Sequence, residues 1–308
     1  MTSAPPQIPA GVDLADELSA LTVPYPAVPE LLQLADRLTD EQRATVLQGR
    51  DFLAGEFGNL GYLNLAEKVP IPADGSVFGR LGYVLMFVSA LPAVREFHRE
   101  RGIDDAQSRL ILSDLGRHAS VYQTRYGING FAEPSWMELH FTGKIYQLGR
   151  LQYERGLASA EVAEAATAAG LPLDQGQPVL SLHIPRYQGP LSAVAVDESI
   201  DRAREFFTEH FPEERYPVAI CTSWLLDPQL AEHLGAQANI PQFASRFQLV
   251  GEPTVDRTSA LEFTFDQPDL PLEQLPQRSR LERAVVQVLR CGGSWHSATG
   301  WFAWYQEA

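Results

Sequence analysis

The spacing of apolar residues changes near Pro134, and this change limits the possible folds of the 308-residue chain more than any other sequence feature. Before Pro134, apolar residues recur at helical spacings, as in Leu31, Leu34 and Leu38, and no strand pattern stands out. After it, apolar and polar residues alternate, which is typical of strands with one buried face. We therefore expect an α+β protein with a helical N-terminal domain over residues 1–130 and a second domain over 131–308.

The first domain is expected to contain four main helices, at 29–38, from Thr39 to about 53–57, at 77–100 and at 105–126. Thr39 followed by Gln42 has the spacing of a capping box, in which each side chain bonds the other residue's backbone N–H. The helix at 77–100 is apolar on nearly every face in its first half, which predicts that it is buried. Its most apolar stretch, 82–94, is too short to span a bilayer.

In the second domain we expect strands at 137–143, 145–154, 179–184, 217–226, 246–250 and 261–265, with an aromatic strand at the C-terminus. The expected helices lie at 159–169, 192–211, 227–234 and 277–289, with a further short helix beginning at Asn239. Residues 185–190 read as a loop between a strand and a long helix because they contain Pro185, Gly189 and Pro190.

Charge and cysteine content narrow the class of protein. The chain has 24 Lys and Arg against 39 Asp and Glu, a formal net charge of −15, which repels nucleic acid and anionic membrane surfaces. Cys221 and Cys291 match neither zinc-ligand spacing nor a disulfide framework, and the histidines show no metal spacing. We expect a cytoplasmic protein with no bound metal and no secretory signal, and its oligomeric state is left open.

The order of elements and the segment 183–191 resemble the GNAT superfamily of acyl-CoA-dependent N-acyltransferases. Members carry a loop of the type Arg/Gln-x-x-Gly-x-Gly/Ala, whose backbone N–H groups hold the pyrophosphate of coenzyme A. Here Arg186 and Gly189 match that pattern, whereas Leu191 departs from it.

A longer resemblance covers the segments 148–154 (LGRLQYE), 182–185 (LHIP), 221–226 (CTSWLL) and 239–243 (NIPQF). These segments are similar to bacterial two-domain acyltransferases, which join a helical N-acyltransferase N-terminal domain to a GNAT-like C-terminal domain. The resemblance implies a mixed β-sheet flanked by helices and acyl-CoA (coenzyme A) as the donor. It implies no particular acceptor.

The loop after the strand at 179–184 is the expected donor site. A helix N-terminus offers unpaired N–H groups, Gly189 allows close backbone approach, and Arg186 adds a cation for phosphate. The expected donor-binding residues are Ile184, Arg186, Tyr187, Gln188, Gly189, Leu191 and Ser192. The alternative is that this segment only turns the chain between strand and helix.

His183 is the first candidate for the general base, since a neutral imidazole beside the loop could accept the proton that an attacking amine loses. Glu138 and His140, expected on the polar face of a strand, are candidates for acceptor binding or a second base. Structural roles remain open for all three. Arg150 and Glu154 are expected to form a structural ion pair, because they lie four apart on one strand.

Cys221 and Ser223 share one face of the strand at which GNAT folds usually open to admit the donor's pantetheine arm. A cysteine nucleophile would need an activating neighbour such as His183, and a buried structural cysteine is the alternative. GNAT enzymes often protonate the leaving thiolate with a tyrosine in the next helix, but the segment 227–247 contains none. Ser223, Tyr187 or water could supply that proton.

These observations predict an enzyme that moves an acyl group from a CoA or carrier-protein thioester to an amine of a small-molecule acceptor by direct attack. Two alternatives remain. One is a non-catalytic GNAT-like module that binds a thioester or metabolite, and the other is an acyl-CoA hydrolase or decarboxylase.

Overall fold

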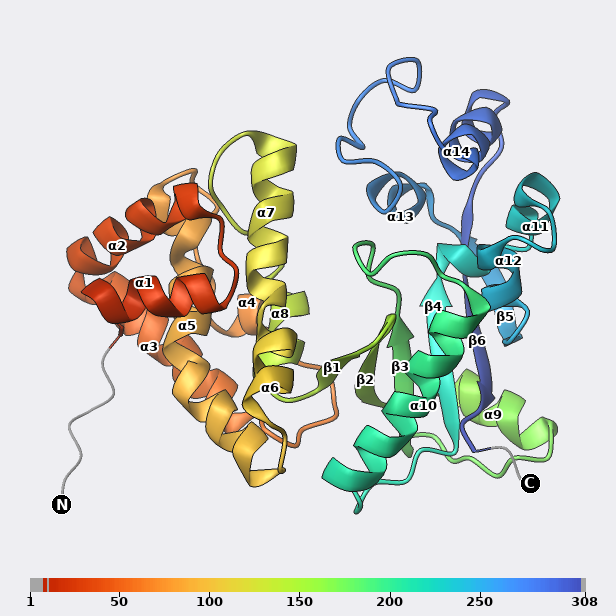
Figure 1. Ribbon diagram of the computed structural model, residues 1–308, viewed down its shortest axis with the longest axis horizontal. Coiled ribbons are helices and arrows are strands. Elements are labelled where there is room, and N and C mark those ends of the chain that lie inside the picture. Colours follow the sequence, from red (N-terminus) through yellow and green to blue (C-terminus); the bar gives the residue numbers. More distant parts are fainter. Residues whose placement is uncertain (1–7, 10, 306–308) are drawn as a thin grey trace. The chain divides into compact units, whose positions relative to one another are not determined.

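The computed structural model describes residues 8–9 and 11–305 and separates into two compact units, Met1–Tyr146 and Gln147–Ala308. Figure 1 shows the elements of each unit. The division falls within the first strand, β1 (Ile145–Leu148), and thus later than the expected boundary after residue 130. The difference arises because the segment expected to be the first strand of the second domain is a helix of the first unit.

The first unit is helical, as expected. Its helices are α1 (Gly11–Ala20), the 3₁₀ helix η1 (Tyr25–Ala27), α2 (Val28–Arg37), α3 (Asp40–Gly55), α4 (Leu65–Lys68), α5 (Val77–Glu100), α6 (Asp105–Leu112), α7 (Asp114–Tyr126) and α8 (Pro134–Phe141). The capping box of Thr39 and Gln42 at the start of α3 is confirmed. The single helix expected over 105–126 is divided at Ser113 into α6 and α7.

Helix α5 forms the centre of the helical unit, and its expected burial is confirmed. It packs against α2, α3 and α8, and Phe87 contacts the rings of Phe131 and Phe141. Among the described residues, α5 is the one helix long and apolar enough to cross a membrane, yet 72% of its apolar window is buried inside the protein. This burial is that of a core helix.

Residues 137–143 were expected to form a strand, and this prediction is wrong because most of the segment lies in α8. Pro134 occupies the first helical position, where its missing N–H costs no hydrogen bond. Met137 and Phe141, four residues apart, both face the core of the unit. Over so short a segment, apolar residues two apart fit a strand and those four apart fit a helix, so the pattern was ambiguous.

The second unit contains the sheet. Its other strands are β2 (Leu151–Leu157), β3 (Pro178–His183), β4 (Val218–Ser223), β5 (Gln248–Val255) and β6 (His296–Ala303), in the order β1-β2-β3-β4-β6-β5. The β3–β4 pair is parallel, and the pairs β2–β3, β4–β6 and β5–β6 are antiparallel. The mixed sheet expected from the resemblance is therefore confirmed.

Three segments of this unit differ from expectation. The strand expected over 217–226 ends at Ser223, and its last three residues form the 3₁₀ helix η2 (Trp224–Leu226). The single strand expected over 145–154 is instead β1 and β2, joined by a turn at Gly149, whose φ of +73° is readily adopted by glycine. Residues 261–265 were expected to form a strand, and this prediction is wrong. Residues 261–262 are the last two of helix α13 (Arg257–Glu262), and residues 263–265 follow it. The strand pattern there was only five residues long.

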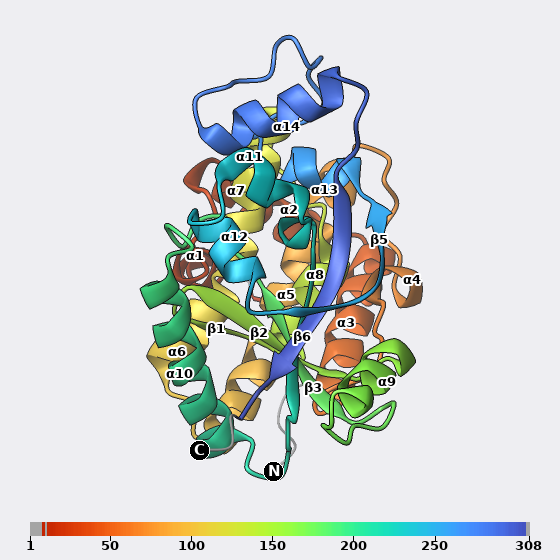
Figure 2. The same ribbon diagram turned by 90° about the vertical axis from the view of Figure 1, so that its right-hand side faces the viewer.

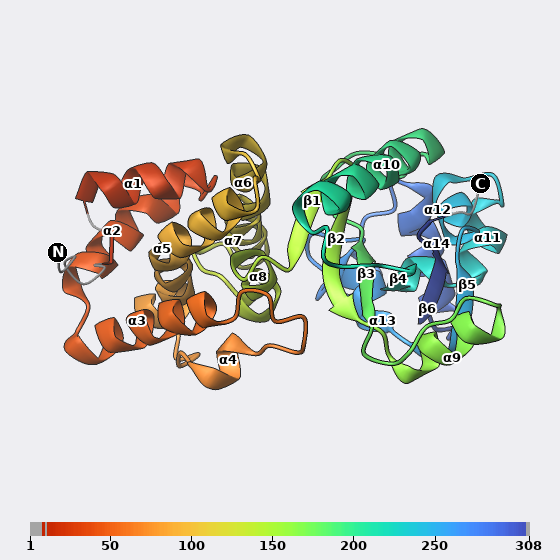
Figure 3. The ribbon, with the colours of Figure 1, turned by 90° about the horizontal axis from the view of Figure 1, so that it is seen from below.

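Helices cover both faces of the sheet. Figures 2 and 3 show α10 (Ala193–His210) on one side and α9 (Ala160–Ala168) on the other. On the α10 side, Tyr153 of β2 packs its ring against Phe207. On the α9 side, Val179 and Trp301 share a core with Val162. The remaining helices are α11 (Gln229–Leu234), α12 (Asn239–Ala244), α14 (Arg280–Arg290) and the 3₁₀ helix η2 (Trp224–Leu226).

Candidate active site

The parallel strands β3 and β4 pair over only a short length. Their partners are Leu180 with Ala219 and Ser181 with Ile220, although β3 continues to His183 and β4 to Ser223. Beyond Ser181 the two strands therefore separate, and the backbone groups on their facing edges need other partners. In open α/β sheets, such a gap beyond the carboxyl ends of strands is a usual position for a ligand.

A pocket of about 330 Å³ opens at the carboxyl ends of these two strands. Its wall is mostly apolar and has four polar side chains, and it is lined by Arg150, Ile184, Pro185, Arg186, Leu191, Trp224, Leu225, Leu234, Ala238, Asn239, Ile240, Phe263, Arg280 and Leu281. Three of the polar side chains are arginines. On a chain with a net charge of −15, this is a locally positive, partly apolar site, which suits an amphipathic anion.

The loop between β3 and α10 forms one wall of the pocket, and Arg150 holds its two ends. The guanidinium Nη1 donates to the carbonyl oxygen of Pro185 at 2.9 Å, and Nε donates to that of Pro190 at 3.3 Å. Burial lowers the pKa of Arg150. Between these anchors Gly189 has a φ of +76°, and no atom lies within 4 Å of the position that a Cβ would occupy. The loop thus has fixed ends and an open centre.

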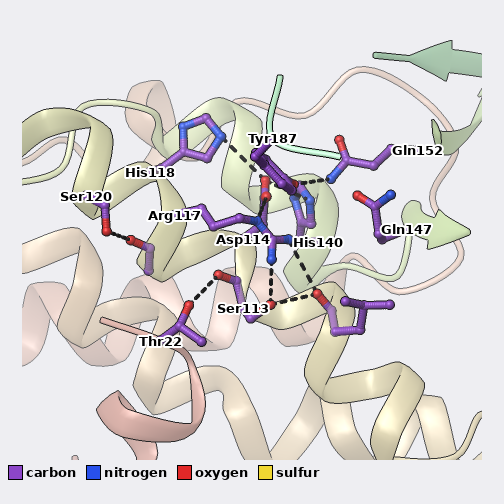
Figure 4. Close-up of polar contacts among 12 residues, drawn as sticks. Thr22, Ser113, Asp114, Arg117, His118, Ser120, His140, Gln147, Gln152 and Tyr187 are labelled. Carbon is purple, nitrogen blue, oxygen red and sulfur yellow. Dashed lines mark hydrogen bonds and ion pairs between the residues drawn. The ribbon is translucent and has the colours of Figure 1, made fainter. Parts of the chain in front are cut away.

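The structure brings three of the seven expected donor-binding residues into the pocket wall, namely Ile184, Arg186 and Leu191. Tyr187, Gln188, Gly189 and Ser192 lie on the same loop outside the lining. The hydroxyl of Ser192 caps α10 by accepting the N–H of Ala195 at 3.3 Å. The hydroxyl of Tyr187 accepts a long hydrogen bond of 3.4 Å from Gln152 Nε2 (Figure 4).

Arg186 is held by the segment that follows α13. Its Nη2 lies 2.9 Å from Asp266 Oδ1 and 3.3 Å from the carbonyl oxygen of Thr264. The side chains of Arg186 and Asp266 are 46% and 68% exposed, so the pair stays accessible to an incoming anion. Since exposed ion pairs are weak, a phosphate could compete with Asp266 for this guanidinium.

His183 lies at the end of β3, and its imidazole contacts Glu154 of the neighbouring strand. His183 pairs with Gln152 and Ser181 pairs with Glu154, so all four side chains share one face of the sheet. His183 Nε2 lies 2.9 Å from Glu154 Oε2. The expected ion pair of Arg150 with Glu154 is therefore wrong, because Arg150 sits in the turn after β1 and bonds loop carbonyls instead.

Cys221 lies on the opposite face of the sheet from His183. Ser181 pairs with Ile220, so the side chain that follows, Cys221, points with Leu180 and Leu182 toward the α10 side. The thiol is buried, and burial raises its pKa to about 12. A histidine-activated cysteine nucleophile is thus contradicted by geometry and by thiol acidity, and Cys221 is a core residue.

Ser223 follows on the same strand and face, where its hydroxyl accepts the backbone N–H of Leu225 at 3.1 Å. This bond caps the 3₁₀ helix η2, which carries Trp224 and Leu225 into the pocket wall. Ser223 thereby shapes the pocket through its neighbours, and its role as an acid for the leaving thiolate remains a prediction.

Glu138 and His140 lie in helix α8 of the helical unit, so the expected strand face that would present both side chains does not exist. Both are buried, and two positions apart on a helix they point in different directions. Glu138 Oε2 accepts the N–H of Leu65 at 2.5 Å, and burial raises the pKa of Glu138 to about 7. His140 Nε2 lies 3.2 Å from Asp114 Oδ2.

Asp114 is a buried carboxylate that sequence reasoning missed. It accepts a hydrogen bond from Arg117 Nε at 2.8 Å, and His118 Nε2 lies 3.4 Å away (Figure 4). It also accepts a hydrogen bond from Trp136 Nε1 at 3.0 Å. Burial alone would raise the pKa of Asp114, but His140 and His118 outweigh burial and lower it. The cluster joins α7 to α8. Because Trp136 and His140 are distant from Asp114 in sequence, no local sequence pattern could have predicted this cluster.

Among the described residues, no group of three or more His, Cys, Asp or Glu side chains is placed to hold a metal ion.

Comparison with protein families matches both units. Residues 12–143 match an N-acyltransferase N-terminal domain, and residues 145–302 match a GNAT-like C-terminal domain. No curated protein matches the chain.

Solved structures resemble the whole chain. An acyltransferase in complex with decanoyl-CoA and teicoplanin is 35% identical, with a TM-score of 0.83 over 99% of this chain and 91% of that one. An acyltransferase in complex with CoA and 10C-teicoplanin is 34% identical, with a TM-score of 0.84 over the same shares of the two chains. The chain therefore belongs to the acyltransferase family that joins an N-acyltransferase N-terminal domain to a GNAT-like C-terminal domain.

Proposed function

We propose that this acyltransferase takes its acyl group from acyl-CoA and transfers it to an amine of a small-molecule acceptor. The observation that carries the donor assignment is the arginine-lined pocket at the point where β3 and β4 separate. The similar acyltransferases that are solved with decanoyl-CoA and CoA support the same donor. Teicoplanin, bound by one of them, makes a glycopeptide the acceptor class to test first.

The donor's parts match the parts of the site. Its pyrophosphate would lie on the loop from Arg186 to Leu191, held by backbone N–H groups at the start of α10 and by Arg186. Its pantetheine arm carries amide groups, which can bond backbone groups on the β4-facing edge of β3 beyond Ser181 as an added strand would. The apolar wall accommodates the uncharged remainder.

The chemical step is a direct attack. The amine nitrogen adds to the thioester carbonyl carbon, a strand N–H stabilises the oxyanion, and the C–S bond then breaks to release the CoA thiolate. His183 accepts the proton that the amine loses, while Glu154 accepts the N–H of its Nε2. The thiolate takes a proton from Ser223, Tyr187 or water.

Calorimetry with decanoyl-CoA tests the donor site. Arg186→Glu reverses the charge of the loop, and Gly189→Asp adds a carboxylate where the backbone has open space around it. We expect each variant to weaken binding by at least about tenfold, the loss of one charge-assisted contact. If wild-type protein binds no acyl-CoA, or if neither substitution matters, the donor assignment is wrong.

A further inference from the structure

The segment between β5 and β6 carries helix α14, whose charge is opposite to that of the chain as a whole. Residues 278–290 contain four arginines, Arg278, Arg280, Arg283 and Arg290, and a single acidic residue, Glu282, whereas the whole chain has a net charge of −15. One of the four, Arg280, lines the pocket, together with its neighbour Leu281. The pocket therefore has a basic wall that belongs neither to the β3–α10 loop nor to the sheet.

Packing fixes where Arg280 lies. Its helix buries Val285, Val286 and Leu289 in a core with Trp224 and Trp295, whose ring centroids are 5.8 Å apart. Trp224 also lines the pocket, so α14 is packed against the pocket wall itself. An arginine on a packed helix is a better-placed anion ligand than one on a free loop.

The acidic residue nearest in sequence is occupied elsewhere. Ser279 and Glu282 form a capping box, in which Glu282 Oε2 accepts the N–H of Ser279 at 2.7 Å and Ser279 Oγ accepts that of Glu282 at 3.0 Å. This arrangement sets the first helical residue at Arg280 and directs the carboxylate back to the backbone.

The three arginines of the pocket differ in how their charges are used. Arg150 donates to two loop carbonyls, and Arg186 pairs with Asp266. Within the described part of the chain, Arg280 has neither an ion pair nor a side-chain hydrogen bond, and it is exposed. Arg280 is thus the pocket cation whose charge is not already compensated by a protein group.

We propose that Arg280 binds a third phosphate of the donor, the one on the ribose of CoA. This assignment rests on the proposed acyl-CoA donor, whose pyrophosphate, with two of the three phosphates, is already assigned to the β3–α10 loop. The ribose phosphate ends the donor opposite the thioester, so it belongs at the exposed rim of the pocket, where Arg280 lies. A carrier-protein donor has no such phosphate, and Arg280 therefore favours free acyl-CoA over an acyl carrier protein.

The test is calorimetry with two ligands, CoA and 3′-dephospho-CoA, which differ only in the ribose phosphate. We expect Arg280→Ala to weaken CoA binding roughly tenfold, as loss of one charge-assisted contact does, and to change dephospho-CoA binding less than twofold. Arg278→Ala is the matched control. Arg278 carries the same charge as Arg280, lies two residues before it and is also exposed, but it does not line the pocket. This control should leave both affinities within twofold.

Other outcomes decide against parts of the account. Three results overturn the ribose-phosphate assignment. Arg280→Ala could weaken the binding of CoA and of dephospho-CoA equally, or leave both unchanged. Alternatively, Arg278→Ala could weaken CoA binding as much as Arg280→Ala does. Wild-type protein that binds CoA and dephospho-CoA equally well also overturns it, while leaving the acyl-CoA donor intact. If wild-type protein binds neither ligand, the proposed donor itself fails.

Discussion

Glu154 Oε2 and His183 Nε2 lie 2.9 Å apart, across the antiparallel strands β2 and β3. A carboxylate accepts but cannot donate, so the contact places the ring proton on Nε2 and leaves Nδ1 as the proton acceptor of the neutral imidazole. Glu154 is then a positioning residue for the proposed base, as the carboxylate of a catalytic triad is for its histidine.

Replacing Glu154 with Ala should lower kcat for acyl transfer by roughly 10- to 100-fold. Without Glu154, His183 would no longer be held in the tautomer that acts as the base, and a general base contributes about this much or more to the rate. The KM for acyl-CoA should stay within about twofold, because Glu154 does not line the pocket proposed for the donor. Steady-state kinetics measure both. Glu161→Ala, an exposed carboxylate on α9, is the matched control.

The same pair permits a double-mutant test. If Glu154 acts through His183, the combined variant with His183→Ala should be no slower than His183→Ala alone. Losses that multiply would show that Glu154 acts independently of the histidine.

Arg150→Lys should weaken CoA binding by about tenfold, because one ammonium group cannot replace the two donors that hold the carbonyls of Pro185 and Pro190. Calorimetry gives the affinity, and thermal unfolding gives the accompanying loss of stability. Arg204→Lys is the control, since Arg204 also bonds a carbonyl, that of Trp304, outside the pocket lining. It should lower stability without changing affinity, and a similar loss of affinity there would refute the role given to Arg150.

Cys221→Ala should leave acyl-transfer turnover within about twofold, since the thiol is buried on the face opposite His183. Alkylation followed by peptide mass spectrometry should label the exposed Cys291 and spare Cys221, whose pKa is raised to about 12. If loss of activity instead follows the extent of Cys221 modification, a covalent mechanism through Cys221 would be supported and this prediction would be wrong.

Because Glu138 is buried, we expect the free energy of unfolding to depend on pH. Its pKa is raised from 4.5 to about 7 by burial, so the folded protein keeps a proton that the unfolded chain releases above pH 4.5. Stability from this group is therefore lost as pH rises from about 4.5 through 7, by roughly 3 kcal/mol for a shift of this size.

Chemical denaturation of wild type and Glu138→Gln should show this loss as a difference that grows in favour of the variant with rising pH. Taking the difference removes the opposite contribution of His98, whose pKa is lowered by burial to about 4. Glu67→Gln, an exposed carboxylate on α4, should show no such trend. A difference between Glu138→Gln and wild type that is independent of pH would contradict the buried, protonated Glu138.

Much of the fold could be predicted from sequence because the decisive patterns were long. The apolar run of α5 and the capping box at Thr39 identified helices, and the strand–loop–helix segment around Arg186, the proposed donor loop, was also predicted. Residues 137–143 and 261–265 were misassigned because five to seven residues fit both periods, and packing against α5 decided for helix in the first case.

The site was predicted in part for a similar reason. Residues of one loop, such as Arg186 and Leu191, could be grouped from sequence. Glu154 is placed beside His183 only by the register of β2 and β3. Asp266 and Arg280 reach Arg186 and the pocket from a segment that is distant in sequence. Glu154 was given the wrong partner because Arg150 and Glu154 were assigned to one strand. The arginine-rich run at 278–290 was the one local signal that could have indicated Arg280.

The central claim is the transfer of an acyl group from CoA to an amine, and the most direct test is the mass of the product. Protein incubated with an acyl-CoA and the glycopeptide acceptor proposed above should yield acceptor heavier by one acyl group, with one free CoA thiol per product, and His183→Ala should slow this formation. Release of CoA with only free fatty acid, or no release of CoA, would contradict the account.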